Sequence, residues 1–120
     1  MKVCIPAESA DLDAPMDARL GRAACFVIVD SDSRQMLTSI PNNQNKLAAA
    51  GAGVQATQTI AQSEAEAVVC ANAGPNAFRV LHAAGISVYT GATGTVAEAL
   101  TAFIEGKLEQ AEQANVQGHW

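Results

Sequence analysis

The sequence predicts an α/β domain of three layers, with helices on both faces of a five-stranded mixed sheet. Short apolar runs bounded by turn residues recur along the chain, as buried strands do. The last two runs, residues 66–71 and 86–90, each lead through a glycine-containing turn into a helical pattern. Two strand–turn–helix units in succession are typical of adjacent parallel strands. The expected order of elements is β-β-β-α-β-α-β-α.

Length and charge limit the classes of function. The chain has 120 residues and a net charge of -5, with 49% hydrophobic but only 4% aromatic residues. We expect one domain over residues 1–108 and a polar C-terminal tail over 109–120. The negative charge argues against nucleic acid and anionic membranes as partners, so an anionic ligand would need a local cationic site. Three scattered cysteines and no apolar run of about 18 residues predict a reduced, cytoplasmic protein.

The first half of the chain supplies three strands. Residues 2–6 form the first predicted strand, and we expect the acidic segment 7–20 to be a long loop. Residues 25–29 and 36–40 flank a polar turn and predict a β-hairpin. Asp30-Ser31-Asp32 begins like a calcium-binding loop, but the glycine and distal glutamate of that motif are absent, so a turn is expected.

The second half supplies the helices. Apolar residues recur at helical spacing over residues 51–63. Pro75 fits the first position of a helix that runs to residue 84, with Gly85 as its C-terminal cap. Thr95 and Glu98 form a capping-box pattern at the start of the last helix.

Catalytic and metal-binding motifs are absent from the sequence. It contains no Cys-x-x-Cys, His-x-x-x-His or His-Glu-x-x-His pattern, and no serine in a Gly-x-Ser-x-Gly context. Residues 51–56 match the loose dinucleotide pattern G-x-G-x-x-A, but a polar loop precedes them where a strand is required. Cys70, at the end of the fourth strand, is a weak candidate metal ligand whose alternative role is core packing.

The starts of the three predicted helices, at residues 51–53, 74–76 and 94–95, remain as a candidate anion site. They contain glycine, which lets a ligand approach the backbone, and they offer unpaired N–H groups and partial positive charge. Arginines of the first loop would add full charge. The alternative is that these glycines serve only tight turns and close packing. The candidate ligand-binding residues are Arg19, Arg22, Gly51, Gly53, Asn72, Gly74, Asn76, Gly91, Thr93, Gly94 and Thr95.

A series of short blocks carries a family resemblance. The blocks are residues 21–23 (GRA), 26–30 (FVIVD), 51–56 (GAGVQA), 74–78 (GPNAF) and 94–96 (GTV). In this order and at these separations, the chain resembles the dinitrogenase iron–molybdenum cofactor biosynthesis family over residues 1–108. No block is specific alone, whereas the series is.

The resemblance implies a ribonuclease H-like fold with a five-stranded mixed sheet. It also implies a non-enzymatic protein that binds or carries an anionic metal–sulfur cluster containing molybdenum. A molybdenum–copper sulfide cluster, which one single-domain member of similar size carries, is the particular candidate that this resemblance suggests. Family members commonly have histidines before the GRA and GAG blocks, where this chain has Arg19-Leu20 and residues 48–50 (AAA). This departure puts histidine coordination in doubt and favours a ligand held by charge and hydrogen bonds.

Two other classes of function stay open at the level of the sequence. One is a cofactor-free module that regulates another protein, such as an ATPase. The other is an enzyme of ribonuclease H type, which ranks last because its strands lack the clustered carboxylates that would hold Mg²⁺.

Overall fold

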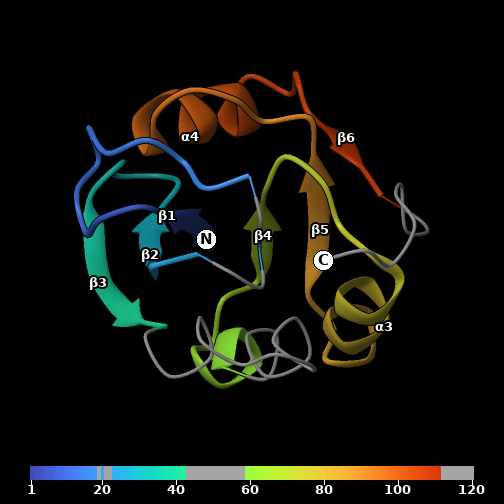
Figure 1. Cartoon of the computed structure of the whole chain (residues 1–120). Coiled ribbons are helices and arrows are strands. Elements are labelled where there is room, and N and C mark those ends of the chain that lie inside the picture. The colour runs from blue at the N-terminus through green and yellow to red at the C-terminus, as the bar shows by residue number, and fades with distance from the viewer. Residues whose placement is uncertain (19, 21–22, 43–58, 112–120) are drawn as a thin grey trace.

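Six strands form one mixed sheet in the order β3-β2-β1-β4-β5-β6 (Figure 1). The computed structural model describes residues 1–18, 20, 23–42 and 59–111. The strands are β1 (Lys2–Ala7), β2 (Cys25–Asp30), β3 (Met36–Pro41), β4 (Ala67–Val69), β5 (Ser87–Thr90) and β6 (Glu109–Gln110). The helices are α3 (Pro75–Ala83) and α4 (Val96–Ile104), and residues 59–62 are also helical.

Strand directions confirm the two predicted pairings. The β2–β3 pair is an antiparallel hairpin, and β2 is also antiparallel to β1. β1, β4 and β5 are mutually parallel neighbours. The parallel pair β4–β5 is joined through α3, as a crossover connection requires.

The predicted count of five strands is wrong, because β6 adds a sixth. Glu109 and Gln110 pair antiparallel with Thr90 and Tyr89 at the edge of the sheet. Both β6 residues are exposed. An exposed edge strand pairs through its backbone and needs no apolar side chains, so polar composition conceals it. The start of the segment expected as a polar tail is therefore part of the sheet.

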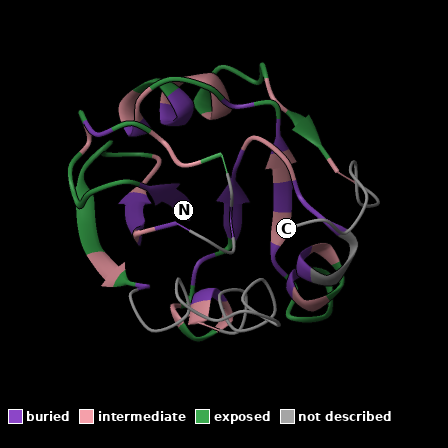
Figure 2. Ribbon diagram, viewed as in Figure 1, coloured by how far each residue is buried: buried purple, intermediate pink, exposed green. Residues whose placement is uncertain are grey.

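Burial on both faces of the sheet confirms the three layers. Successive residues of β1 point to opposite faces: Val3 and Ile5 face α4, whereas Cys4 faces α3 and residues 59–62 (Figure 1). We call the two sets the α4-side core and the α3-side core. β1, β2 and β4 are buried on both sides, whereas the edge strands β3 and β6 are largely exposed (Figure 2).

The two described helices begin differently. α4 has the predicted capping box: Thr95 Oγ1 accepts from the Glu98 N–H at 3.1 Å, and Glu98 Oε1 accepts from the Thr95 N–H at 3.0 Å. α3 begins after Gly74, which provides no side-chain cap. Gly85, at φ +78°, follows its C-terminal end as predicted. No helix in the described part of the chain is long and apolar enough to cross a membrane.

One edge of the sheet gathers the loops on which the candidate site depends. Because β1, β4 and β5 are parallel, all three end at this edge. β2 begins there and β3 ends there, since Ala7 pairs with Cys25 and Cys25 with Pro41. Three loops therefore meet at the edge: residues 8–24, 70–74 and 91–95.

Candidate functional site

The turns after β4 and β5 lie side by side at this edge. The Gly91 N–H donates to the Ala71 carbonyl at 3.1 Å, and the Ala92 N–H donates to the Cys70 carbonyl at 3.2 Å. The predicted site segments around Asn72 and Gly91 are thus joined by backbone hydrogen bonds. The structure therefore brings these two segments of the predicted site together.

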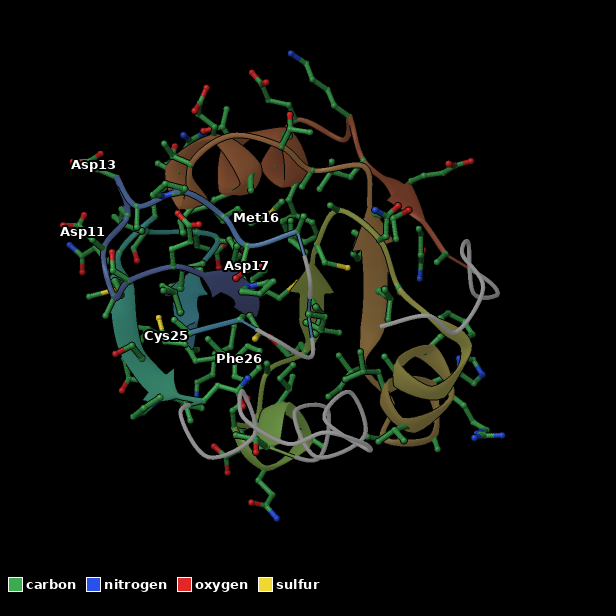
Figure 3. The ribbon with its side chains drawn as sticks, viewed as in Figure 1. Asp11, Asp13, Met16, Asp17, Cys25 and Phe26 are labelled. Carbon is green, nitrogen blue, oxygen red and sulfur yellow. The ribbon has the colours of Figure 1, made fainter. Side chains whose placement is uncertain are left out.

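The first loop crosses the edge from one face of the sheet to the other. Leu12 and Met16 pack against the α4-side core, whereas Leu20 and Ala23 belong to the α3-side core. Between them, the Asp17 N–H donates to the Pro6 carbonyl at 3.0 Å and fixes the crossing to the end of β1. Figure 3 shows Met16 and Asp17 at this crossing. The loop therefore passes from the α4 side at Met16 to the α3 side at Leu20.

The predicted arginines lie outside the described residues, as do Gly51 and Gly53. Their neighbours are well placed: Leu20 and Ala23 are both fully buried.

The start of α4 is already occupied by the first loop. The N–H groups of Val96 and Ala97 donate to the carbonyl oxygens of Ala14 and Leu12, at 2.9 and 2.8 Å. The next N–H is taken by Thr95 in the capping box. The expectation that α4 begins with unpaired N–H groups is therefore wrong, because carbonyl groups from residues 12–14 satisfy them. Nothing in the sequence marks these carbonyls, since every residue has one.

Gly94 has a structural reason to be glycine. Its φ is +87°, and a Cβ there would lie 2.7 Å from Glu98 Oε1. Its carbonyl also accepts from the Met16 N–H at 2.9 Å. Gly91 shares the left-handed conformation, at φ +92°, but a Cβ would meet no atom within 4 Å. Thr93, between them, is exposed.

The start of α3 retains the features of an anion site. Gly74 gives it no capping side chain, and its first turn contains no acidic residue. The first helical bond runs from the Phe78 N–H to the Gly74 carbonyl, at 2.9 Å. Asn72, half-buried, lies in the turn before it, and Asn76 is in its first turn. Negative charge is stabilised at such a terminus.

The thiols are packed inside the protein. Cys70 is fully buried, its Sγ lies 3.7 Å from the Tyr89 carbonyl oxygen, and burial raises its pKa to about 12. Burial also raises the pKa of Cys4 and of Cys25. A neutral thiol is a poor metal ligand. Among the described residues, no three histidine, cysteine or acidic side chains cluster as a metal site would require.

The carboxylates of the first loop stay mainly in solvent. Asp11 and Asp13 are exposed and point away from the molecule at the outer end of the loop (Figure 3). They lie in the part of the loop that packs on the α4 side, because their neighbour Leu12 contacts that core.

Most of the chain matches the model of a known family. The family model described as dinitrogenase iron-molybdenum cofactor matches residues 1–106. The chain belongs to this family.

Individual relatives span nearly the whole chain. An uncharacterized protein of Methanocaldococcus jannaschii is 30% identical over 113 residues, which cover 93% of this chain and 92% of that protein. The apo form of the orange protein from Desulfovibrio gigas is a similar structure, with a TM-score of 0.89 and 35% identity over 96% of each chain. A Thermotoga protein described as a DUF35 family member has a TM-score of 0.75 and 37% identity over 91% of each chain.

Alanine at Gly94 should destabilise the fold more than alanine at Gly91. Both substitutions force a side chain into the left-handed region, at a cost of about 1–3 kcal/mol. Gly94→Ala also displaces the Glu98 carboxylate and breaks its bond to the Thr95 N–H, which adds about 0.5–1.5 kcal/mol. Urea denaturation measures both losses. In a Glu98→Ala background the difference should disappear; a difference that persists there would contradict this explanation.

The buried thiols should make the protein less stable at alkaline pH. The pKa of Cys70 rises from 9.0 to about 12 on folding, so above pH 9 the unfolded chain loses a proton that the folded chain keeps. The free energy of unfolding should therefore fall from pH 9 to 12. Cys70→Ala should make this fall shallower, whereas the exposed Thr93→Ala should leave it unchanged. Equal slopes in all three proteins would show that the thiol stays accessible to solvent.

Proposed function

We propose that this chain is a non-enzymatic protein that binds and carries an anionic metal–sulfur cluster containing molybdenum, with a molybdenum–copper sulfide cluster as the specific candidate. The observation that carries the proposal is the likeness to the apo orange protein over 96% of both chains, within a family described by an iron-molybdenum cofactor. A carrier role, in place of catalysis, also agrees with the absence of catalytic motifs in the sequence.

The binding surface we propose lies on the α3 side of the loop edge. It combines the uncapped start of α3, with Asn72, Gly74 and Asn76, and the two arginines of the first loop. A sulfide-capped cluster completes its own metal coordination, so the protein need supply only positive charge and hydrogen-bond donors. Helix N–H groups and guanidinium groups each supply positive charge and hydrogen-bond donors.

The turn after β5 has a different part in this proposal. Gly91 and Thr93 are exposed and could contact a ligand held at the edge. Gly94 and Thr95 shape the start of α4, whose donors the first loop takes. Gly51 and Gly53 stay predictions, as does the ribonuclease H-like assignment of the fold.

The cellular location of the protein and an alternative function are also proposals. Three free cysteines, all buried, suit the reduced cytoplasm that we propose as the location. A cofactor-free interaction module that partners another protein, such as an ATPase, is the alternative function. A measurement of cluster binding distinguishes the carrier from the cofactor-free module directly.

Loss of the two arginines should weaken cluster binding. The double variant Arg19→Ala/Arg22→Ala removes the positive charge from the α3 side of the edge, so its affinity for the cluster should fall at least about tenfold, the equivalent of one charge-assisted hydrogen bond. The measurement is anaerobic reconstitution with tetrathiomolybdate and Cu(I), followed by visible absorption after gel filtration.

A matched control removes two positive charges elsewhere. Lys2 and Lys107 form exposed ion pairs with Glu64 and Glu105, at 3.5 and 3.1 Å, which contribute little to stability. The Lys2→Ala/Lys107→Ala variant should bind the cluster like the wild type. If both double variants lose affinity equally, net charge and not a local site holds the cluster. If the wild type binds none, the interaction module becomes the better proposal.

A further inference from the structure

We propose that the outer edge of β3 is an interface at which two copies of this chain pair, strand against antiparallel strand. β3 (Met36–Pro41) stands at the end of the strand order, so none of the described strands covers its outer side (Figure 1). It is also largely exposed, whereas β2 beside it is buried along most of its length (Figure 2). An edge strand with unpaired backbone groups is a template for another strand. This inference goes beyond the proposed function and does not depend on cluster binding.

The alternation of hydrogen bonds along β3 indicates which backbone groups face outward. One residue beyond the strand, the Asn42 N–H donates to the Ala24 carbonyl at 2.9 Å. In an antiparallel pair, residues two apart turn their backbone groups to the same side. Ile40 therefore faces β2 like Asn42, whereas the N–H and carbonyl of Ser39 point away from it. Pro41 agrees with this assignment, because proline has no N–H and occupies outward-facing positions on edge strands.

A bulge and a proline limit how two such edges can pair. The register of β3 against β2 shifts between Ile28 and Val29, which places a bulge at Leu37. Pro41 closes the other end, where it offers no donor. The outward-facing segment is therefore short and centred on Ser39. Two copies related by a two-fold axis would pair Ser39 with its own counterpart, through two reciprocal N–H to C=O hydrogen bonds.

The side chains on this edge suit contact with a second copy. Met36 and Leu37 are 40% and 49% exposed, so adjacent positions of β3 hold two of the four exposed large hydrophobic side chains among the described residues. In the two-fold register, Leu37 of one copy lies opposite Pro41 of the other, and two apolar side chains meet.

The absence of charge on this edge favours a second copy over other partners. Residues 35–42 contain no charged side chain, although the chain has a net charge of -5. Two copies that repel each other elsewhere can therefore approach here without placing like charges side by side. A strongly charged partner strand would find no opposite charge along these residues.

Sedimentation velocity of the chain alone measures the predicted dimer. The wild type should show a concentration-dependent monomer–dimer equilibrium at concentrations up to about 1 mM. Ser39→Lys would set two ammonium groups opposite each other across the two-fold axis, so it should raise the dimer dissociation constant at least about fivefold. The control Ala83→Lys adds the same charge at an exposed position of α3, which packs on β5 and not on β3. It should leave the dissociation constant unchanged.

A mixture of oppositely charged variants tests the register. Ser39→Lys and Ser39→Glu should each weaken self-association, and an equimolar mixture should restore it, because the two charges then face each other. Leu37→Ser is an independent variant, which removes an exposed apolar side chain and should weaken the dimer with little loss of stability. Circular dichroism and urea unfolding of each variant at low protein concentration establish that the fold is intact.

Three results would overturn the inference. The first is a wild type that stays monomeric at the highest concentration, which would leave the β3 edge to a different partner. The second is a dimer that Ser39→Lys and Ala83→Lys weaken equally. The third is a mixture of the Ser39→Lys and Ser39→Glu variants that associates no better than either alone. Since no cluster is added, failure of the proposed function would leave these outcomes unchanged.

Discussion

The hydrogen bonds between the first loop and the start of α4 determine which backbone donors remain at this edge of the sheet. The carbonyls of Leu12 and Ala14 take the N–H groups of Ala97 and Val96, which would otherwise attract an anion. The same bonds hold the first part of the loop on the α4 side. The chain must then cross the edge to reach Leu20 in the α3-side core. One set of backbone contacts thus closes the start of α4, whereas the start of α3 has no side-chain cap.

This arrangement addresses an electrostatic problem. A chain with a net charge of -5 repels an anionic cluster at long range, so binding requires a local reversal of potential. The carboxylates of Asp11 and Asp13 are exposed on the outer part of the loop. The α3 terminus has no acidic residue in its first turn, in contrast to α4, which has Glu98. The start of α3 is therefore the less acidic of the two helix starts.

Local side-chain signals allowed much of the fold to be predicted from the sequence. Alternating apolar residues indicated the hairpin, Thr95 and Glu98 indicated the start of α4, and glycine turns indicated the parallel strands. What escaped prediction depends on the backbone. β6 pairs through exposed main chain at Glu109 and Gln110, and the first loop bonds α4 through carbonyls. Asn42 looked like a loop residue because its burial depends on tertiary contacts. Of the site, the paired turns were predictable, whereas the closure of α4 was not.

Amide chemical shifts would test directly whether the cluster binds on the α3 side. The measurement is an anaerobic nuclear magnetic resonance titration of the ¹⁵N-labelled protein with the tetrathiomolybdate–copper cluster. We expect the largest changes at Asn72, Gly74 and Ala77, with smaller ones at Leu20 and Ala23. Val96 and Ala97 should change little, because their N–H groups stay bonded to the first loop. Dominant changes at Val96 and Ala97, with none at the start of α3, would contradict it.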